Sequence, residues 1–118
     1  MAGVETKNLN SPDEVRTFTH GKMELVNIGG GSVGRATFEP GWRWSNDVRP
    51  IAKTELCEAP HFLYQVSGRM KIAMRGGGEF ECGPGDVVVI PPGHDAWVVG
   101  NDPVVVIDWG GATNYAKG

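Results

Sequence analysis

The sequence predicts an all-β domain, an antiparallel sandwich or barrel built from many short strands. Short runs rich in β-branched and aromatic residues follow one another along the chain, and each is closed by Gly, Pro, Asn or Asp. No segment shows apolar residues at a sustained helical spacing. The 18 glycines and 8 prolines are spread between these runs. This distribution is typical of turns between strands.

The first elements expected are a short turn, a hairpin and a third strand. Ser11–Glu14 (SPDE) has a capping-box pattern with proline at the first helical position, which predicts one helical turn at most. Residues 16–28 (RTFTHGKMELVNI) predict a hairpin, with His20 and Gly21 in its tight turn and the imidazole in solvent. Alternation in residues 32–41 predicts a half-buried strand.

The rest of the chain is a long connection followed by six runs. The connection, Trp42 to Pro60, has no clear period, and long ordered loops of this kind often carry function. From His61 onward the expected strands lie in HFLYQVSG, RMKIAMR, GGGEFEC, GPGDVVVIPPG, HDAWVVG and NDPVVVIDWGG. We expect one domain over 1–118: an N-terminal turn and hairpin in 1–31, a barrel over about 34–110, and a short C-terminal tail.

Composition narrows the class of protein. The 118 residues carry a net charge of −3 and form no basic patch of the kind that nucleic-acid binding requires. The longest apolar runs are too short to span a membrane, and the N-terminus lacks a signal-peptide pattern. Two cysteines, Cys57 and Cys82, predict free thiols in a reducing compartment. We expect a cytoplasmic protein without nucleic-acid or membrane partners.

Gly85, Pro91 and Gly93 are spaced as a glycine, five residues, a proline, one residue and a glycine. This spacing resembles the second motif of the cupin superfamily, whose fold is a jelly-roll β-barrel with a double antiparallel sheet. The family motif continues with two residues and a metal-binding histidine. Ala96 stands at that position, and His94 comes two residues earlier.

The first cupin motif runs histidine, one residue, histidine, three or four residues, glutamate, six residues and glycine. Gly68 matches its end, and His61 stands where the family has glutamate. In the shorter spacing, Cys57 and Glu55 stand at the two histidine positions. The segments GWRWS, SGRMKI and GHDAWVVG are also similar to a group of small bacterial cupins.

A second register of that motif is equally compatible with the sequence. Here the early strand ends at the turn Pro40-Gly41, Asp47 and Arg49 take the histidine positions, and an insertion precedes His61.

The resemblance implies a metal site inside the barrel. The candidate ligands are His61 and His94, with Cys57 as the anionic partner or, in its place, Glu55 or Asp47. Two histidines and a carboxylate suit non-haem iron, whereas two histidines and a thiolate suit zinc better. We expect a divalent metal (Zn, Fe, Mn or Ni) and no organic cofactor.

A catalytic arrangement without metal stays open, because some cupins, such as sugar epimerases, use a histidine as general base oriented by a carboxylate. Asp95 cannot orient His94, since neighbours on a strand face opposite ways. The carboxylate must come from another strand, and no catalytic residue is assigned.

A pocket for a small molecule is expected in the barrel interior, near residues that share the face of His61 or lie at the barrel mouth. Its candidate lining residues are Leu63, Tyr64, Gln65, Trp44 and Trp97. The function expected is that of a divalent-metal-dependent enzyme of oxygenase, isomerase or lyase type acting on a small organic substrate. The alternative is a metal-free module that binds or senses a small ligand. We expect a homodimer, and further aromatic residues are expected to pack between the sheets or in the dimer interface.

Overall fold

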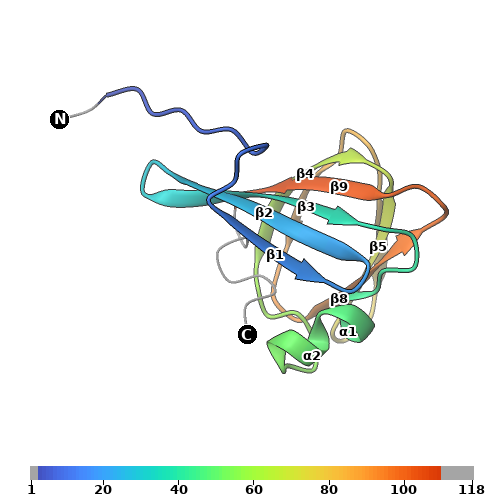
Figure 1. The fold of residues 1–118 in the computed structure, drawn as a ribbon. Coiled ribbons are helices and arrows are strands. Elements are labelled where there is room, and N and C mark those ends of the chain that lie inside the picture. Colours follow the sequence, from blue (N-terminus) through green and yellow to red (C-terminus); the bar gives the residue numbers. More distant parts are fainter. Residues whose placement is uncertain (1–2, 110–118) are drawn as a thin grey trace.

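The computed structural model describes residues 3–109, and in this part of the chain nine strands form two antiparallel sheets around a common core (Figure 1). The first sheet has the order β1-β2-β3-β9-β4-β7, and the second has the order β6-β5-β8. The strands are β1 (Glu14–Phe18), β2 (Gly21–Ile28), β3 (Gly31–Phe38), β4 (His61–Ser67), β5 (Arg69–Met74), β6 (Glu79–Cys82), β7 (Val87–Ile90), β8 (His94–Val99) and β9 (Val104–Asp108). The predicted all-β fold of two antiparallel sheets is confirmed.

The predicted hairpin is formed by β1 and β2, which pair with Phe18 opposite Gly21. His20 lies in the turn between them with a positive φ of 63°. Its imidazole is partly exposed, as expected, but its Nδ1 also lies 3.1 Å from a carboxylate oxygen of Asp47. The turn residue therefore ties the hairpin to the connection that follows β3.

The helical turn expected over Ser11–Glu14 is not formed. The backbone N–H of Asp13 donates to the carbonyl of Leu25 at 2.8 Å, and β1 begins at Glu14. Pairing across the hairpin thus uses the backbone groups that a helical turn would need. A turn lies slightly earlier, where the N–H of Ser11 donates to the carbonyl of Asn8 at 2.9 Å.

The long connection contains two short helices, α1 (Trp44–Asp47) and α2 (Arg49–Ala52), at one end of the barrel (Figure 1). Four residues are too few to produce an amphipathic pattern, which explains why the sequence showed no helical period there. Pro50 in the first turn of α2 suits a helix start, and Lys53 ends it in the left-handed conformation with φ of 62°.

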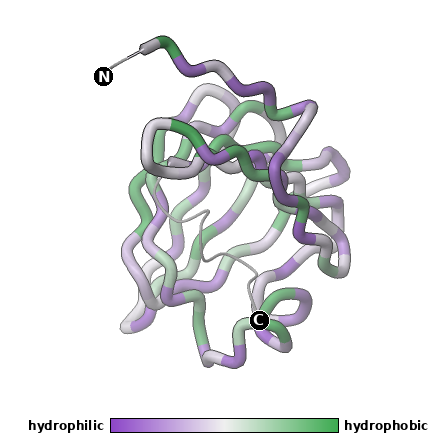
Figure 2. Tube along the Cα trace, turned by 60° about the vertical axis from the view of Figure 1, so that its left-hand side comes forward, coloured by the Kyte–Doolittle hydropathy of each residue, from purple (hydrophilic) through white to green (hydrophobic). Residues whose placement is uncertain are grey.

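The core lies between the sheets and follows the expected alternation along the strands. Figure 2 shows hydrophobic and hydrophilic residues following one another along the chain. Residues at every second position point inward, and the buried apolar set includes Met23, Leu25, Ala36, Phe38, Trp42, Trp44, Leu63, Met70, Ile72, Ala96, Val104 and Val106. No helix among residues 3–109 is long and apolar enough to cross a membrane.

Candidate metal centre

Three candidate ligands, Cys57, His61 and His94, meet in the barrel interior. His61 begins β4, His94 begins β8, and Cys57 lies in the connection before β4. All three are buried, and their ligand atoms lie within 4.8 Å of one another. Sγ of Cys57 is 3.6 Å from Nε2 of His61. The structure therefore brings together the residues that the sequence offered as the main metal ligands.

The backbone holds Cys57 against the start of β8. The N–H of Cys57 donates to the carbonyl of His94 at 2.8 Å, and the N–H of Gly93 donates to the carbonyl of Cys57 at 2.7 Å. Gly93 has a φ of 92°, which favours glycine at this turn. The Pro-Pro-Gly turn of the second cupin motif thus places His94 next to the thiol of Cys57.

Each histidine is oriented by an acceptor at its Nδ1. Nδ1 of His61 lies 2.5 Å from Oδ2 of Asp108, and Nδ1 of His94 lies 2.8 Å from the carbonyl oxygen of Pro91. An N–H donated from Nδ1 leaves Nε2 as the nitrogen available to a metal. A carboxylate or carbonyl behind a ligating histidine is the usual outer-shell arrangement in metalloproteins.

Asp108, which orients His61, was missed by the sequence analysis. It ends β9, and the inward face of this strand reads Val104, Val106, Asp108. The aspartate occupies a position that period two assigns to the core, and its side chain is 2% exposed. An acidic residue at a predicted core position is the signal that could have identified it.

Charge coupling in the cluster changes both pKa values. Burial by itself raises the pKa of the Cys57 thiol, but hydrogen bonds and charge from His61 and His94 outweigh burial and lower it to about 6. Burial lowers the pKa of His61, whereas the contacts with Asp108 and Cys57 raise it to about 9. At neutral pH the metal-free pair is a thiolate and an imidazolium, and a metal ion would replace the proton between them.

The donor set fits a divalent ion of the zinc type. A tetrahedral zinc ion at about 2.3 Å from a thiolate and about 2.0–2.1 Å from an imidazole places these two ligand atoms about 3.6 Å apart. The observed distance between Sγ of Cys57 and Nε2 of His61 is 3.6 Å. Soft thiolate and imidazole ligands favour Zn, Fe or Ni over the oxygen-preferring Mn.

A small cavity adjoins the cluster. It has a volume of about 30 Å³, and its polar lining comes from His61, His94 and Asp108, while most of its wall is apolar. That volume exceeds the roughly 10–15 Å³ of cavity space that one water molecule needs. Trp42 also lines it, and its buried indole N–H has no acceptor among the described residues.

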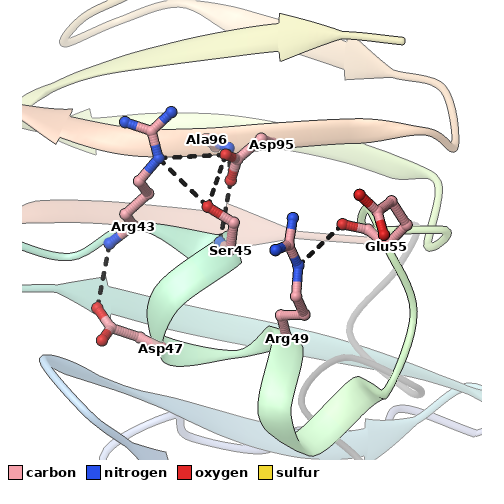
Figure 3. A network of polar contacts seen from close by, with 7 residues as sticks. All are labelled: Arg43, Ser45, Asp47, Arg49, Glu55, Asp95 and Ala96. Atoms are coloured by element: carbon pink, nitrogen blue, oxygen red, sulfur yellow. Dashed lines mark hydrogen bonds and ion pairs between the residues drawn. The ribbon is translucent and has the colours of Figure 1, made fainter.

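Two predicted ligands lie outside the cluster. Asp47 accepts from the backbone N–H of Arg43 at 3.1 Å and contacts His20, so its carboxylate is turned toward the start of α1 (Figure 3). Glu55 has an exposed side chain, and its backbone carbonyl accepts from Nε of Arg49 at 3.0 Å. The shorter spacing of the first motif therefore agrees with the structure at Cys57 but not at Glu55.

The predicted pocket residues divide in the same way. Trp44 and Leu63 line the cavity. Tyr64 faces outward because it alternates with the inward residues of β4. Gln65 faces inward, but its amide donates to the carbonyls of Gly68 and Cys82 beyond the cavity.

Trp97, the remaining predicted pocket residue, lies outside the cavity under the guanidinium of Arg43, 4.3 Å from the ring centroid. It alternates with Ala96, which is on the cavity side of β8.

Asp95, next to His94, has a structural role. It accepts from Ser45 at its backbone N–H (3.0 Å) and hydroxyl (2.8 Å), from Nε of Arg43 (3.2 Å) and from the N–H of Ala96 (2.9 Å), as Figure 3 shows. These hydrogen bonds connect the start of α1 to β8. The carboxylate of Asp95 faces away from the imidazole of His94, as strand alternation predicts.

Comparison with known proteins agrees with this architecture. Residues 48–106, half of the chain, match the family model of the EutQ-like cupin domain. No curated protein sequence matches the chain at a significant level.

Among solved structures, the chain is similar to a sugar phosphate isomerase of the cupin superfamily from Silicibacter pomeroyi (TM-score 0.61, 19% identity, covering 88% of this chain and 73% of that chain). It is also similar to a cupin-like protein from Thermotoga maritima (TM-score 0.56, 20% identity, covering 82% and 73%). A mutant of Bacillus subtilis oxalate decarboxylase matches with a TM-score of 0.54 at 22% identity, over 79% of this chain but only 26% of that chain. At these identities the likeness concerns the fold alone. The family match and the two-sheet architecture together show that the chain belongs to the cupin superfamily, with an EutQ-like cupin domain at residues 48–106.

Proposed function

We propose that the protein is a divalent-metal-dependent enzyme that acts on a small organic substrate inside the barrel. The observation that carries this proposal is the convergence of Cys57, His61 and His94, with both histidines oriented through Nδ1. Zinc is the ion that the thiolate and two imidazoles suit best. Three protein ligands are the number typical of catalytic sites, because they leave a position for water or substrate.

The charges around the site support a divalent ion. Cys57 as a thiolate and Asp108 as a carboxylate supply two negative charges in a buried region, and these would balance the charge of the ion. A bound ion would supply a Lewis acid that polarises a substrate oxygen or activates water. The chain's own contribution is to orient the imidazoles and to surround the reacting group with apolar side chains.

The cavity restricts the substrate class. At about 30 Å³, it admits a molecule or group of only a few non-hydrogen atoms unless side chains move. No lysine or arginine lines it among the described residues, so a sugar phosphate of the kind named for the Silicibacter pomeroyi protein does not suit it. Isomerase and lyase chemistry, both represented among the structural neighbours, and oxygenase chemistry stay open.

Metal analysis tests the proposal. Protein purified without a histidine tag or added metal is expected to contain about one equivalent of a divalent metal. The His61→Ala variant is expected to lose it, and His20→Ala, which changes the remaining histidine outside the cluster, is expected to keep it. Circular dichroism would check that both variants fold.

Less than about a tenth of an equivalent in the wild type, with no uptake on reconstitution, would overturn the proposal. It would favour the metal-free binding module, which should then show thermal stabilisation by a metabolite from a panel. Unchanged metal content in His61→Ala would remove His61 from the ligand set.

A further inference from the structure

An apolar groove lies beside the metal centre, between the edges of the two sheets. β7 is an edge strand of the first sheet, and β6 is an edge strand of the second. The groove has a volume of about 320 Å³, and its apolar lining includes Val88 and Ile90 of β7, Ile72 of β5 and Phe80 of β6. Small-molecule sites in proteins typically have volumes of roughly 300–1,000 Å³.

Strand pairing in the first sheet places this groove next to the cavity of the metal centre. His61 and Leu63 of β4 line the cavity. Their cross-strand partners on β7, Ile90 and Val88, line the groove. The side chains of directly opposite residues are close, with Cβ atoms about 4.5–5.5 Å apart. In this sheet the groove therefore lies one strand away from the cavity.

The second sheet repeats the arrangement. His94 and Ala96 of β8 line the cavity. Their cross-strand partners on β5, Met74 and Ile72, line the groove. Each of the two histidines thus has a direct neighbour in the groove wall, and these neighbours come from opposite sheets.

Ile90 separates the groove from the cavity, because its side chain lines both. On the other sheet Met74 is partly buried, and its unbranched thioether chain changes rotamer readily. A path between Ile90 and Met74 leads from the groove to the two histidines. Pro91, whose carbonyl oxygen orients His94, also lines the groove.

We propose that the groove is the outer part of the substrate site, and that the substrate is a small amphiphilic molecule. Its metal-binding head group occupies the cavity, and its apolar tail lies in the groove. This inference rests on the proposed function, because the metal ion holds the head group.

The sizes and the chemistry of the two spaces support this division. The cavity, at about 30 Å³, admits only a head group of a few atoms, so the rest of a larger substrate needs a second space. Among the described residues, no charged or polar side chain lines the groove. A polar substituent there would lose its hydrogen bonds to water without replacement, whereas an apolar tail gains from burial.

Isothermal titration calorimetry of the zinc-loaded protein with two straight-chain hydroxamates tests the inference. Acetohydroxamate presents the metal-binding head with a methyl group, and hexanohydroxamate extends it into a tail. The two differ by four methylenes, and burial of one methylene tightens binding about fourfold. We expect hexanohydroxamate to bind about 20-fold more tightly or better, which corresponds to burial of roughly half of the added tail. This comparison in the wild type does not depend on any variant.

Phe80→Glu and Phe62→Glu form a matched pair. The two phenylalanines are similarly exposed, at 59% and 53%, but Phe80 lines the groove and Phe62 lies on the outer face of β4. Phe80→Glu is expected to weaken hexanohydroxamate binding about tenfold and to leave acetohydroxamate binding unchanged, because only the tail meets the new charge. Phe62→Glu is expected to bind both probes like the wild type. Thermal unfolding and zinc content would show that both variants fold. An equal loss in Phe62→Glu would place the tail outside the groove and overturn the inference.

The wild-type titrations distinguish this inference from the proposed function. Zinc-loaded protein that binds both hydroxamates with equal affinity would overturn the inference and leave the proposed function standing. Protein that takes up no zinc and binds neither probe would overturn the proposed function, and this inference with it. Equal affinities together with a dimer that Phe80→Glu dissociates, measured by light scattering, would mean that a second copy of the chain covers the groove.

Discussion

His61 lies between the carboxylate of Asp108 and the thiol of Cys57. The protonation of its imidazole determines how strongly a metal must compete with a proton for Nε2. Its Nδ1 faces Asp108, and its Nε2 faces Sγ of Cys57. With a pKa of about 9, the imidazole carries a proton on Nε2 at neutral pH when no metal is present. Metal binding must displace that proton. Affinity in the wild type should therefore rise about tenfold per pH unit between pH 7 and pH 9.

Replacing Asp108 by Asn separates orientation from proton competition. The variant loses the carboxylate that raises the pKa of His61, so this pKa falls toward the ordinary value of about 6.5. At pH 9, where His61 in the wild type is losing its proton, we expect the variant to bind Zn²⁺ about 10–100-fold more weakly because the ring is less well oriented. At pH 7 the difference should be smaller, since the variant no longer has to release a proton.

Competition with a chromophoric chelator at the two pH values measures this difference. Equal affinities at pH 9 would show that Asp108 does not orient the ligand. A difference that grows toward pH 7 would contradict the proton displacement. Thermal unfolding of the metal-free variant provides the control for folding.

Motif spacing pointed to Cys57 and His61, and His94 stood two residues before the position of the family's histidine, but spacing gave no signal for Asp108. His61 follows Pro60 and His94 follows Pro92-Gly93, and residues of this kind carry a strong local signal. Asp108 reaches His61 because β9 pairs with β4. The residues next to Asp108 and next to His61 do not predict this pairing. Asp47 was a plausible ligand by residue type alone, but its carboxylate bonds locally to the start of α1.

Among the elements, α1 depends on one side chain of the neighbouring strand. Asp95 on β8 is 8% exposed and accepts from two groups of Ser45, including its backbone N–H. Asp95→Ala would leave these donors without an acceptor. We expect the free energy of unfolding to fall by about 2–4 kcal/mol, most of it from Ser45, because the half-exposed Arg43 contributes little.

Urea unfolding of the metal-free proteins measures that loss. Asp102→Ala is the matched control, because Asp102 is exposed in the loop before β9 and its removal should change stability by less than about 0.5 kcal/mol. A loss below about 1 kcal/mol for Asp95→Ala would mean that α1 is held by the burial of Trp44 and Val48 rather than by the carboxylate.

This dependence explains which elements were predictable. Strands such as β4 and β9 alternate buried and exposed residues over their whole length, so the pattern predicts both the element and its inward face. A helix of four residues such as α1 has no period to detect, and its conformation is set by a distant carboxylate. At Ser11–Glu14 the local pattern predicted a helical turn that does not form, because the backbone N–H of Asp13 bonds to Leu25 of β2 instead.

For the molecule as a whole, the sequence predicted strands and faces, but strand order required the family resemblance. In the first sheet β9 lies between β3 and β4, although it is far from β4 and β3 in the sequence. β9 therefore joins these two strands into one sheet. Alternation is a property of each strand alone and does not name its partner. The jelly-roll order implied by the cupin motifs supplies that partner.

The two sheets meet at Gly68, the single residue between β4 of the first sheet and β5 of the second. Its φ is 75°, and a Cβ there would meet the backbone carbonyl of Pro103, just before β9, at less than contact distance. Gly68 therefore allows three strands to meet where the chain changes sheets. Gly68→Ala adds a strained φ and a backbone clash, so we expect it to lower the free energy of unfolding by more than about 3 kcal/mol.

Gly100→Ala separates the two effects, because Gly100 has a similar φ of 88° with no atom near its would-be Cβ. Strain alone should lower its free energy of unfolding by about 1–2 kcal/mol in the same urea experiment. Because Gly68 links the sheets that carry His61 and His94, its substitution should also weaken Zn²⁺ binding, whereas Gly100→Ala should leave it unchanged. Equal losses of stability in the two variants would show that the close approach of Pro103 does not determine how the sheets join.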